Sequence, residues 1–365
     1  MLSGSAPRLR VDPFGIAPDG RTVEIHTLSN ATGMEVCFLS LGGIIVSVKV
    51  PDRDGVHVDV TPGYDTLDDY LADADYFGAL IGRYANRIAG GRFSLDGTDH
   101  TLTPNDGTNL LHGGTHGFHR ALWTVDTFAR DCSVGAVLTY TSPSGEEGFP
   151  GTLSVRVTYT LTDTNELWFD YAATTDAATP VNLTQHLYFN LAGHAAGDIL
   201  DHQLTLFASC YLPVNDQIIP TGQLCPVEGT PFDFRHERTI GAEMHPRDAL
   251  LPIDGYDHSF VLDDNEATTT RVAARLYEPA SGRQLEIETT EPGLQFYSGD
   301  QLGNGTSGKN GRPYVRHGAL ALETQHFPNS PNEPSFPSTI LRPGEKYASR
   351  TVYRFLTRGL SSEKT

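Results

Sequence analysis

The chain has 365 residues, a formal net charge of -19, 38% hydrophobic residues and four cysteines. This length supports a large buried core, and the excess of acidic groups argues against a nucleic acid or an anionic membrane surface as partner, because both attract clustered Lys and Arg. A neutral small molecule is compatible with this charge.

Alternation of apolar and polar residues with a period of two predicts β-strands along most of the chain. The first strand-like runs are residues 22–28 (TVEIHTL) and 34–50 (MEVCFLSLGGIIVSVKV). Residues 66–69 (TLDD) resemble a capping box, which predicts a short helix with its apolar residues on one face. Helical signals are otherwise few.

Three hairpins are predicted further along the chain. Asp96-Gly97 is a strong two-residue turn, and alternating segments also face each other within residues 153–171 and 271–290. Additional strand-like runs are residues 202–212, 258–262, 319–325 and 349–356. The βαβ alternation of a doubly wound sheet is absent, so we expect an all-β protein of stacked, mainly antiparallel sheets.

The chain shows no linker, charge block or composition break, and we expect a single domain over residues 1–365. The cysteines form no CxxC pair and are expected to be free thiols. Residues 1–15 lack the apolar core of a signal peptide, and no run reaches the length of a transmembrane helix. We therefore expect a cytoplasmic protein, as a monomer or weak homodimer.

One imidazole lies in the middle of a strand-like apolar run, NLTQHLYFN (182–190). A histidine in this position is either a packed core residue or a proton donor held rigidly in a pocket, and by itself the former is commoner. The role of His186 therefore depends on which other polar groups the fold brings to it.

Two glycine-flanked motifs carry further polar groups. In GRYANRI (82–88), Arg87 beside Asn86 is either an ion-pair partner or a planar fork for ligand oxygens. NLLHGGTHGFH (109–119) carries three histidines, His112, His116 and His119. Their spacing matches no zinc motif, so we expect no metal. The glycines after His112 instead allow the backbone to approach a ligand closely, or merely provide a turn.

Three more polar residues occupy strand positions. Asp257 opens an apolar segment and is either a turn residue or an acceptor for sugar hydroxyls. Gln295 points away from the face of its apolar neighbours. Glu323 ends the apolar run 319–322, whose lack of alternation predicts burial on both faces. Its carboxylate is either a structural partner or a base strengthened by partial desolvation.

No nucleophile elbow, phosphate-binding loop or dinucleotide fingerprint occurs. Taken together and in this order, five segments resemble the galactose mutarotases, or aldose 1-epimerases. They are GRYANRIAGGRFSLDG (82–97), NLLHGG (109–114), VNLTQHLYFNLAG (181–193), DGYDHSFVL (254–262) and LETQHFPNSPN (322–332). The resemblance covers residues 23–356 and implies a β-supersandwich fold and interconversion of the α and β anomers of free sugars.

The resemblance places the general base at Glu323 and the general acid at His186. It assigns sugar contacts to Asn86, Arg87, His112, Asp257 and Gln295. The sequence departs from the family pattern GRxANRI at Tyr84, where we expect a small aliphatic residue. We expect Tyr84 to pack beside the site.

These groups suffice for anomer exchange. Opening the hemiacetal ring removes a proton from the C1 hydroxyl and adds one to the ring oxygen, so we expect an acid and a base that face each other across the space of one pyranose. Only the C1–O5 bond breaks at carbon, and no cofactor is needed. The sequence leaves the preferred aldose open.

Three other classes of function compete with this interpretation. A glycoside hydrolase would use two carboxyl groups, for which Glu323 and Asp257 are the candidates. A non-catalytic sugar-binding module would present aromatic platforms, and the two tryptophans, Trp123 and Trp168, are weakly placed for that. A mutarotase for phosphorylated hexoses would need a basic cluster, which the sequence does not show.

Overall fold

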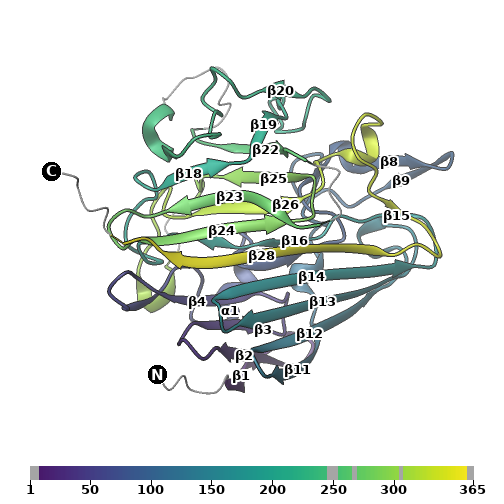
Figure 1. The fold of residues 1–365 in the computed structure, drawn as a ribbon. Coiled ribbons are helices and arrows are strands. Elements are labelled where there is room, and N and C mark those ends of the chain that lie inside the picture. The colour runs from purple at the N-terminus through teal and green to yellow at the C-terminus, as the bar shows by residue number, and fades with distance from the viewer. Residues whose placement is uncertain (1–7, 245–253, 265–268, 304–306, 360–365) are drawn as a thin grey trace.

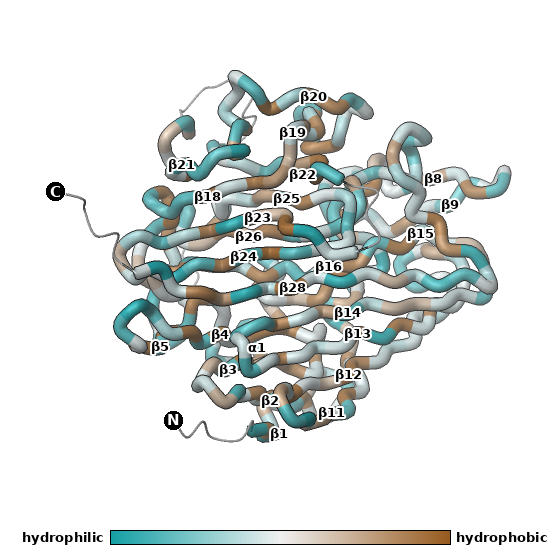
Figure 2. The backbone as a smooth tube through the Cα atoms, viewed as in Figure 1, coloured by the Kyte–Doolittle hydropathy of each residue, from teal (hydrophilic) through white to brown (hydrophobic). Residues whose placement is uncertain are grey.

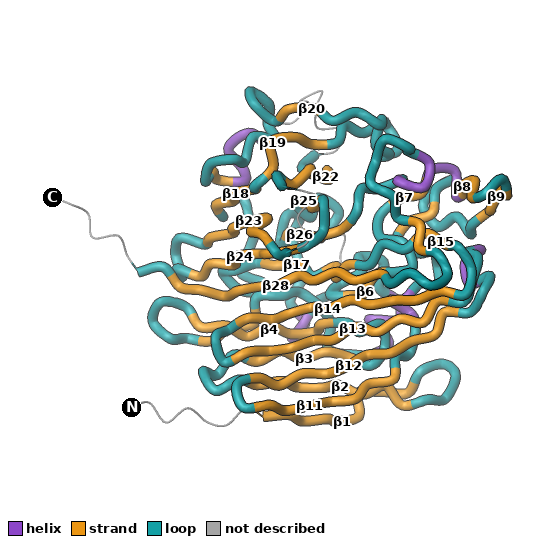
Figure 3. The backbone as a smooth tube through the Cα atoms, turned by 45° about the vertical axis from the view of Figure 1, so that its right-hand side comes forward, coloured by secondary structure: helices purple, strands orange, loops and turns teal. Residues whose placement is uncertain are grey.

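The computed structural model describes residues 8–244, 254–264, 269–303 and 307–359. Within them, strands dominate and helices are few and short (Figure 3). The paired strands of every sheet run antiparallel, as predicted for an all-β protein. None of the described helices is long and apolar enough to span a membrane.

Three larger sheets form the body of the molecule (Figure 1). A five-stranded sheet has the order β1 (Arg8–Ile16), β2 (Thr22–Ser29), β3 (Glu35–Leu39), β4 (Ile45–Pro51) and β5 (His57–Asp59). A nine-stranded sheet has the order β11 (Thr124–Arg130), β12 (Ser133–Ser142), β13 (Leu153–Thr162), β14 (Glu166–Thr175), β28 (Tyr347–Thr357), β24 (Arg283–Thr289), β23 (Arg271–Tyr277), β18 (Gln203–Leu206) and β21 (Arg238–Thr239). A six-stranded sheet has the order β17 (Tyr188–Phe189), β26 (Leu320–Gln325), β25 (Gly293–Tyr297), β22 (Asp257–Leu262), β19 (Ala208–Tyr211) and β20 (Cys225–Pro226).

Short elements complete the described chain. The two-stranded sheets are β6 (Ala79–Ile81) with β16 (Thr184–His186), β7 (Arg87–Ile88) with β10 (Leu110–Leu111), β8 (Arg92–Leu95) with β9 (Thr98–Thr101) and β15 (Thr179–Pro180) with β27 (Ile340–Leu341). The helices are α1 (Leu67–Ala72) and six single 3₁₀ turns: η1 (Ala89–Gly91), η2 (Phe118–Arg120), η3 (Glu146–Gly148), η4 (Ile240–Glu243), η5 (Lys309–Gly311) and η6 (Ser330–Asn332).

The three sheets share one hydrophobic core. A chain of edge-to-face aromatic contacts joins Phe38 of β3, Tyr159 of β13, Phe169 of β14, Tyr353 of β28 and Phe189 of β17, with ring centroids 4.9–5.6 Å apart. Such pairs add stability beyond the area they bury. The nine-stranded sheet therefore packs against the other two as one side of a sandwich, and its strands alternate hydrophobic and hydrophilic residues, as β24 does in Figure 2.

The predicted local elements are confirmed. Strands β8 and β9 meet at the Asp96-Gly97 turn, β13 pairs with β14 and β23 pairs with β24. Helix α1 begins after Thr66, whose hydroxyl accepts a hydrogen bond from the Asp69 amide at 3.2 Å. The segment before Thr22, which carried no motif, contributes the edge strand β1.

Two of the predicted strand-like runs are each divided into two strands in the structure. Residues 34–50 form two strands, β3 and β4, because the chain turns at Gly42 and Gly43, whose φ angles are 63° and 53°. Residues 202–212 contribute β18 to the nine-stranded sheet and β19 to the six-stranded sheet, and the chain passes between them at Phe207. Periodicity cannot show such a change of sheet, because it does not identify the strand with which each half pairs.

Candidate active site

A cavity of about 300 Å³ opens beside the six-stranded sheet. This volume is at the lower end of the range for small-molecule sites, roughly 300–1,000 Å³. Six of the seven predicted site residues line it: Asn86, Arg87, His112, His186, Asp257 and Glu323. The seventh, Gln295, lies behind Asp257.

Glu323 lies in the middle of β26, whose six residues are all buried. The register with β25 places it directly opposite Gln295. Its carboxylate is 2% exposed, and Oε2 has no hydrogen-bond partner among the described residues. Burial raises the pKa of Glu323 well above its ordinary value, the charge of Asp257 raises it further, and Arg87 opposes the rise.

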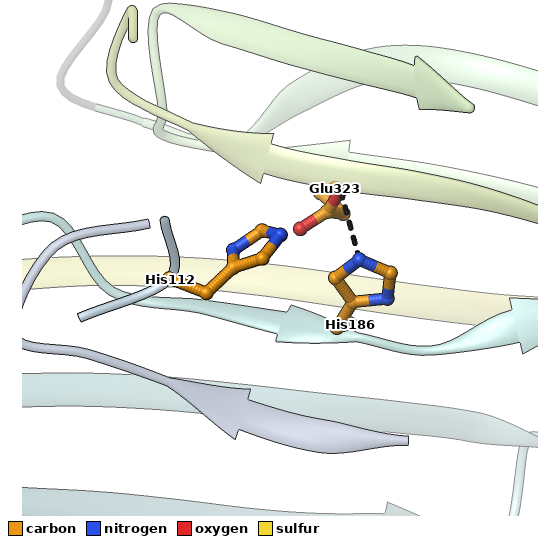
Figure 4. A group of neighbouring side chains, drawn as sticks. All are labelled: His112, His186 and Glu323. Carbon is orange, nitrogen blue, oxygen red and sulfur yellow. Dashed lines mark ion pairs between the residues drawn. The ribbon is translucent and has the colours of Figure 1, made fainter. Parts of the chain in front are cut away.

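His186 ends β16, and its carbonyl accepts a hydrogen bond from the Gly78 amide at 3.0 Å. Its Nε2 is 3.6 Å from Oε1 of Glu323 (Figure 4). The two groups are therefore direct neighbours, closer than the pyranose-wide separation expected from the sequence. Burial lowers the pKa of His186 to about 4. The imidazole faces the cavity, so His186 is not a core residue alone.

Two hydrogen bonds join Asn86 and His112, one between their backbones and one from the Asn86 backbone to the His112 side chain. His112 N donates to the Asn86 carbonyl at 3.1 Å, and the Asn86 amide donates to Nδ1 of His112 at 3.2 Å. Since Nδ1 accepts this bond, Nε2 of the neutral imidazole carries the proton and is a donor. Burial lowers the pKa of His112 well below its ordinary value, with smaller contributions from His186 and Arg87.

This tautomer also bears on metal binding. Potential ligand atoms of His112, His186 and Glu323 lie within 4.8 Å of one another. A metal on Nε2 of His112 would displace its proton, which Nδ1 cannot take because it faces the Asn86 N–H. The residues therefore do not fit a metal through this nitrogen. Among the described residues, the only group of potential ligands contains His112 but neither His116 nor His119, so the three histidines of residues 112–119 do not form a ligand set.

Arg87 connects two carboxylates of the cavity wall. Its Nε donates to Oδ2 of Asp106 at 2.7 Å, and Nη1 lies 3.7 Å from Oδ2 of Asp257. Gln295 donates to the other oxygen of Asp257 at 2.6 Å. Burial raises the pKa of Asp257, while Arg87 and the Gln295 hydrogen bond counteract the rise. Gln295 therefore orients Asp257 from behind.

Tyr84 packs beside the site, as expected. It is fully buried, and its hydroxyl donates to the Phe327 carbonyl at 3.2 Å and accepts from the Ser330 amide at 3.1 Å. It thus links the segment before Asn86 to the loop that follows Glu323. It is absent from the cavity wall.

Several residues that line the cavity were not predicted from the sequence. They are Asp75, Tyr76, Asp106, Tyr188, Tyr297, Asp300 and Gln301. Tyr188 had a signal, because it follows His186 by two positions and so lies on the same side of an extended chain. Burial, and then the neighbouring Asp73, raises the pKa of Asp75 to about 6. Nothing in the local sequence of Asp75 or Tyr76 indicates their place.

The cavity wall argues against a mutarotase for phosphorylated hexoses, and the tryptophans argue against a non-catalytic sugar-binding module. The cavity wall carries five carboxylates and one Arg or Lys, Arg87, which disfavours a phosphorylated sugar. Trp123 is 3% exposed in the core, and Trp168 lies under the guanidinium of Arg350 at 4.9 Å. Neither tryptophan forms a platform at the cavity.

Comparison with known proteins relates the chain to one family. A family profile described as aldose 1-epimerase matches residues 24–354. The galactose mutarotase of Homo sapiens is 46% identical over 343 residues, which are 94% of this chain and 97% of that protein. The aldose 1-epimerase of Escherichia coli is 41% identical, over 93% and 97% of the two chains.

Solved structures agree with the sequence comparison. A galactose 1-epimerase from Lactobacillus acidophilus superposes with a TM-score of 0.85 at 26% identity, covering 97% of this chain and 100% of that one. An aldose epimerase homologue from C. elegans has a TM-score of 0.82 at 31% identity, covering 91% and 98%. The predicted galactose mutarotase-like fold is thereby confirmed.

Proposed function

The chain belongs to the aldose 1-epimerase family, and we propose that it interconverts the α and β anomers of free hexoses such as D-galactose and D-glucose, with Glu323 as general base and His186 as general acid. It is thus an isomerase of sugars. The observation that carries the residue assignment is the 3.6 Å approach of the His186 imidazole to the Glu323 carboxylate inside the cavity.

The adjacency of acid and base suits the reaction. In a pyranose the anomeric oxygen and the ring oxygen are bonded to the same carbon, so one compact pair reaches both. Glu323 accepts the proton of the C1 hydroxyl while His186 donates a proton to the ring oxygen, and the C1–O5 bond breaks. The aldehyde rotates about C1–C2 and closes from its other face, and the two residues then exchange roles.

The pair holds one proton in two arrangements. Carboxylate with imidazolium opens the ring, and carboxylic acid with neutral imidazole is what remains after opening. Burial favours the second arrangement, because it raises the pKa of Glu323 and lowers that of His186. Activity should fall at low pH, where the pair gains a second proton, and at high pH, where it loses the first. These limits belong to the pair and not to either residue.

The remaining residues are proposed to bind the sugar. Nε2–H of His112, the Asn86 side chain and the Arg87 guanidinium supply donors, and the Asp257 carboxylate supplies an acceptor. A neutral sugar ring carries several hydroxyl groups, each of which can both donate and accept a hydrogen bond. A site that offers donors and an acceptor therefore suits it. Gln295 is proposed to act by holding Asp257, to which it is bonded at 2.6 Å. No step requires a cofactor.

We further propose one domain over residues 1–365 and a cytoplasmic location, as a monomer or weak homodimer. All four cysteines are free, as expected for a reducing compartment.

Polarimetry of freshly dissolved α-D-galactose, α-D-glucose and α-D-xylose tests the function and ranks the aldoses. We expect anomer exchange above the spontaneous rate, and a loss of roughly 10²–10⁴-fold in His186→Asn and in Glu323→Gln, with unchanged circular dichroism. Wild-type rates in either variant would refute its assignment. Release of a phenol from an aryl galactoside, without anomer exchange, would instead support a hydrolase that uses Glu323 and Asp257.

A further inference from the structure

No other described residue forms a hydrogen bond with the imidazole of His186. Its Nδ1 is buried without a partner on a neighbouring residue, and its Nε2 is 3.6 Å from Oε1 of Glu323. Its orientation toward Glu323 therefore depends on packing. Three aromatic rings surround it, those of His112, Tyr188 and Tyr76, with centroid distances of 4.9, 4.9 and 5.9 Å.

Tyr76 is the member of this group that contacts several imidazoles at once. Its ring centroid is 4.8 Å from that of His112, 4.9 Å from that of His119 and 5.9 Å from that of His186. Tyr76 also lines the cavity. One side chain thus packs against both the proposed acid and the proposed sugar-binding histidine, whose rings also contact each other.

The backbone of Tyr76 is strained for this placement. Its φ is 57°, a left-handed conformation that a bulky residue rarely adopts. Strain of this kind concentrates at functional sites, where the surrounding structure holds it in place. Here the Tyr76 carbonyl accepts a hydrogen bond from the Ala79 amide at 3.1 Å, at the start of β6, which pairs with the strand of His186.

A second connection runs through Asn105. Its Nδ2 donates to the Tyr76 hydroxyl at 3.4 Å and to the Leu111 carbonyl at 2.9 Å, and its Oδ1 accepts from the Leu111 amide at 2.7 Å. Leu111 directly precedes His112. Hydrogen bonds therefore connect Tyr76 to the backbone segments that carry both His186 and His112.

We propose that Tyr76 is a positioning residue, whose ring keeps the His186 imidazole facing Glu323 and the His112 imidazole facing the sugar. This inference rests on the proposed function. The aromatic ring of Tyr76 positions the two imidazoles, and its hydroxyl contributes less. The only described hydrogen bond of the hydroxyl is long, at 3.4 Å. Without the ring, His186 has free space on one side and its imidazole turns away from Glu323.

The test compares Tyr76→Leu with Tyr76→Phe by polarimetry of galactose. A misplacement of about 1 Å costs roughly 10²-fold in rate, so Tyr76→Leu should lose kcat by about that factor. KM should rise by a smaller factor, because the His112 imidazole also loses its support. Tyr76→Phe keeps the ring and should stay within a few-fold of wild type. In Tyr76→Leu, water that enters should favour the charged imidazole, and the acid limb of the pH profile should move to higher pH.

Two more variants separate positioning from general damage. Tyr211→Leu removes a buried tyrosine of β19 that packs on Phe232, with ring centroids 4.2 Å apart, outside the cavity wall; its kcat and pH profile should be unchanged. If Tyr76→Leu fails to fold, Tyr76→Asn replaces it, because Asn tolerates the left-handed backbone.

The proposal is overturned if the ring-less variant keeps the wild-type kcat and pH profile, if Tyr76→Phe loses as much as Tyr76→Leu, or if Tyr211→Leu loses as much. His186→Asn is measured alongside. A fully active His186→Asn refutes the proposed function itself, whereas an inactive His186→Asn with an active Tyr76→Leu refutes only the positioning role.

Discussion

The cavity has two walls that hold their polar groups in different ways. One is regular: adjacent strands β22, β25 and β26 carry Asp257, Gln295 and Glu323, and the strand register places Gln295 opposite Glu323. The other wall is irregular. Tyr76, Asn86 and His112 all have left-handed backbones there, with φ of 57°, 62° and 51°.

The difference shows two solutions to the same problem. In the regular wall the hydrogen-bond ladder fixes each residue, and the backbone is unstrained. In the irregular wall the side chains point correctly only because tight contacts force unusual backbone angles. Gly113, after His112, illustrates this: a Cβ there would lie 1.9 Å from the Gly82 carbonyl oxygen. The irregular wall should therefore tolerate backbone changes poorly, and the regular wall should respond mainly to loss of charge.

Gly113→Ala should break the irregular wall and have the largest effect on stability. Its φ is 84°, so the left-handed penalty adds to the overlap with backbone, for a total of roughly 2–5 kcal/mol. Gly97→Ala is the matched control, with φ of 80° in the turn between β8 and β9 but no atom within 4 Å. It should cost about 1–2 kcal/mol. Urea denaturation compares the two, and equal losses would show that the close contact is not decisive.

Asp257→Ala should show how the regular wall depends on charge. It leaves Gln295 Nε2 and the Arg87 guanidinium short of a partner, and each buried unpaired group costs about 1–3 kcal/mol. We expect KM for galactose to rise roughly tenfold or more, with a smaller change in kcat. Asp106→Ala removes the other partner of Arg87, a side chain that is 37% exposed, and should raise KM only a few-fold. An unchanged KM in Asp257→Ala would contradict its binding role.

The smallest effect is expected behind the regular wall, where His326 follows β26. Its Nδ1 lies 2.6 Å from Oε2 of Glu291. Burial lowers the pKa of His326, but the charge and hydrogen bond of Glu291 outweigh it and raise the pKa above the ordinary value. The ion pair therefore stabilises the fold fully below about pH 6.5, and this contribution disappears as the pH rises through the folded-state pKa.

His326→Gln should consequently lose roughly 1–2 kcal/mol relative to wild type at pH 5.5 and less at pH 9. Glu291→Gln should show the same direction of change, because it removes the other half of the pair. Urea denaturation of both variants at the two pH values measures the difference. A loss that grows with pH would mean that His326 is neutral in the folded protein.

The sequence predicted the regular features well, because they are local. The Asp96-Gly97 turn and the cap at Thr66 depend on the conformations of a few adjacent residues. The resemblance to the aldose 1-epimerases likewise rests on contiguous segments such as residues 322–332. The sheet exchange at Phe207 was not predictable, since it depends on which distant strand each half pairs with.

The features of the site can likewise be divided into those that the sequence determined and those that the tertiary structure decided. The sequence by itself determined the strand periodicity, the all-β class and the kinds of polar group available, because each follows from neighbouring residues along the chain. Only the tertiary structure decided that Glu323 and His186 approach to 3.6 Å, that Gln295 lies behind Asp257, and that Tyr76 packs against three imidazoles. Distances and burial arise where separate strands and loops pack together, and the pKa shifts of the buried pair are set by that packing.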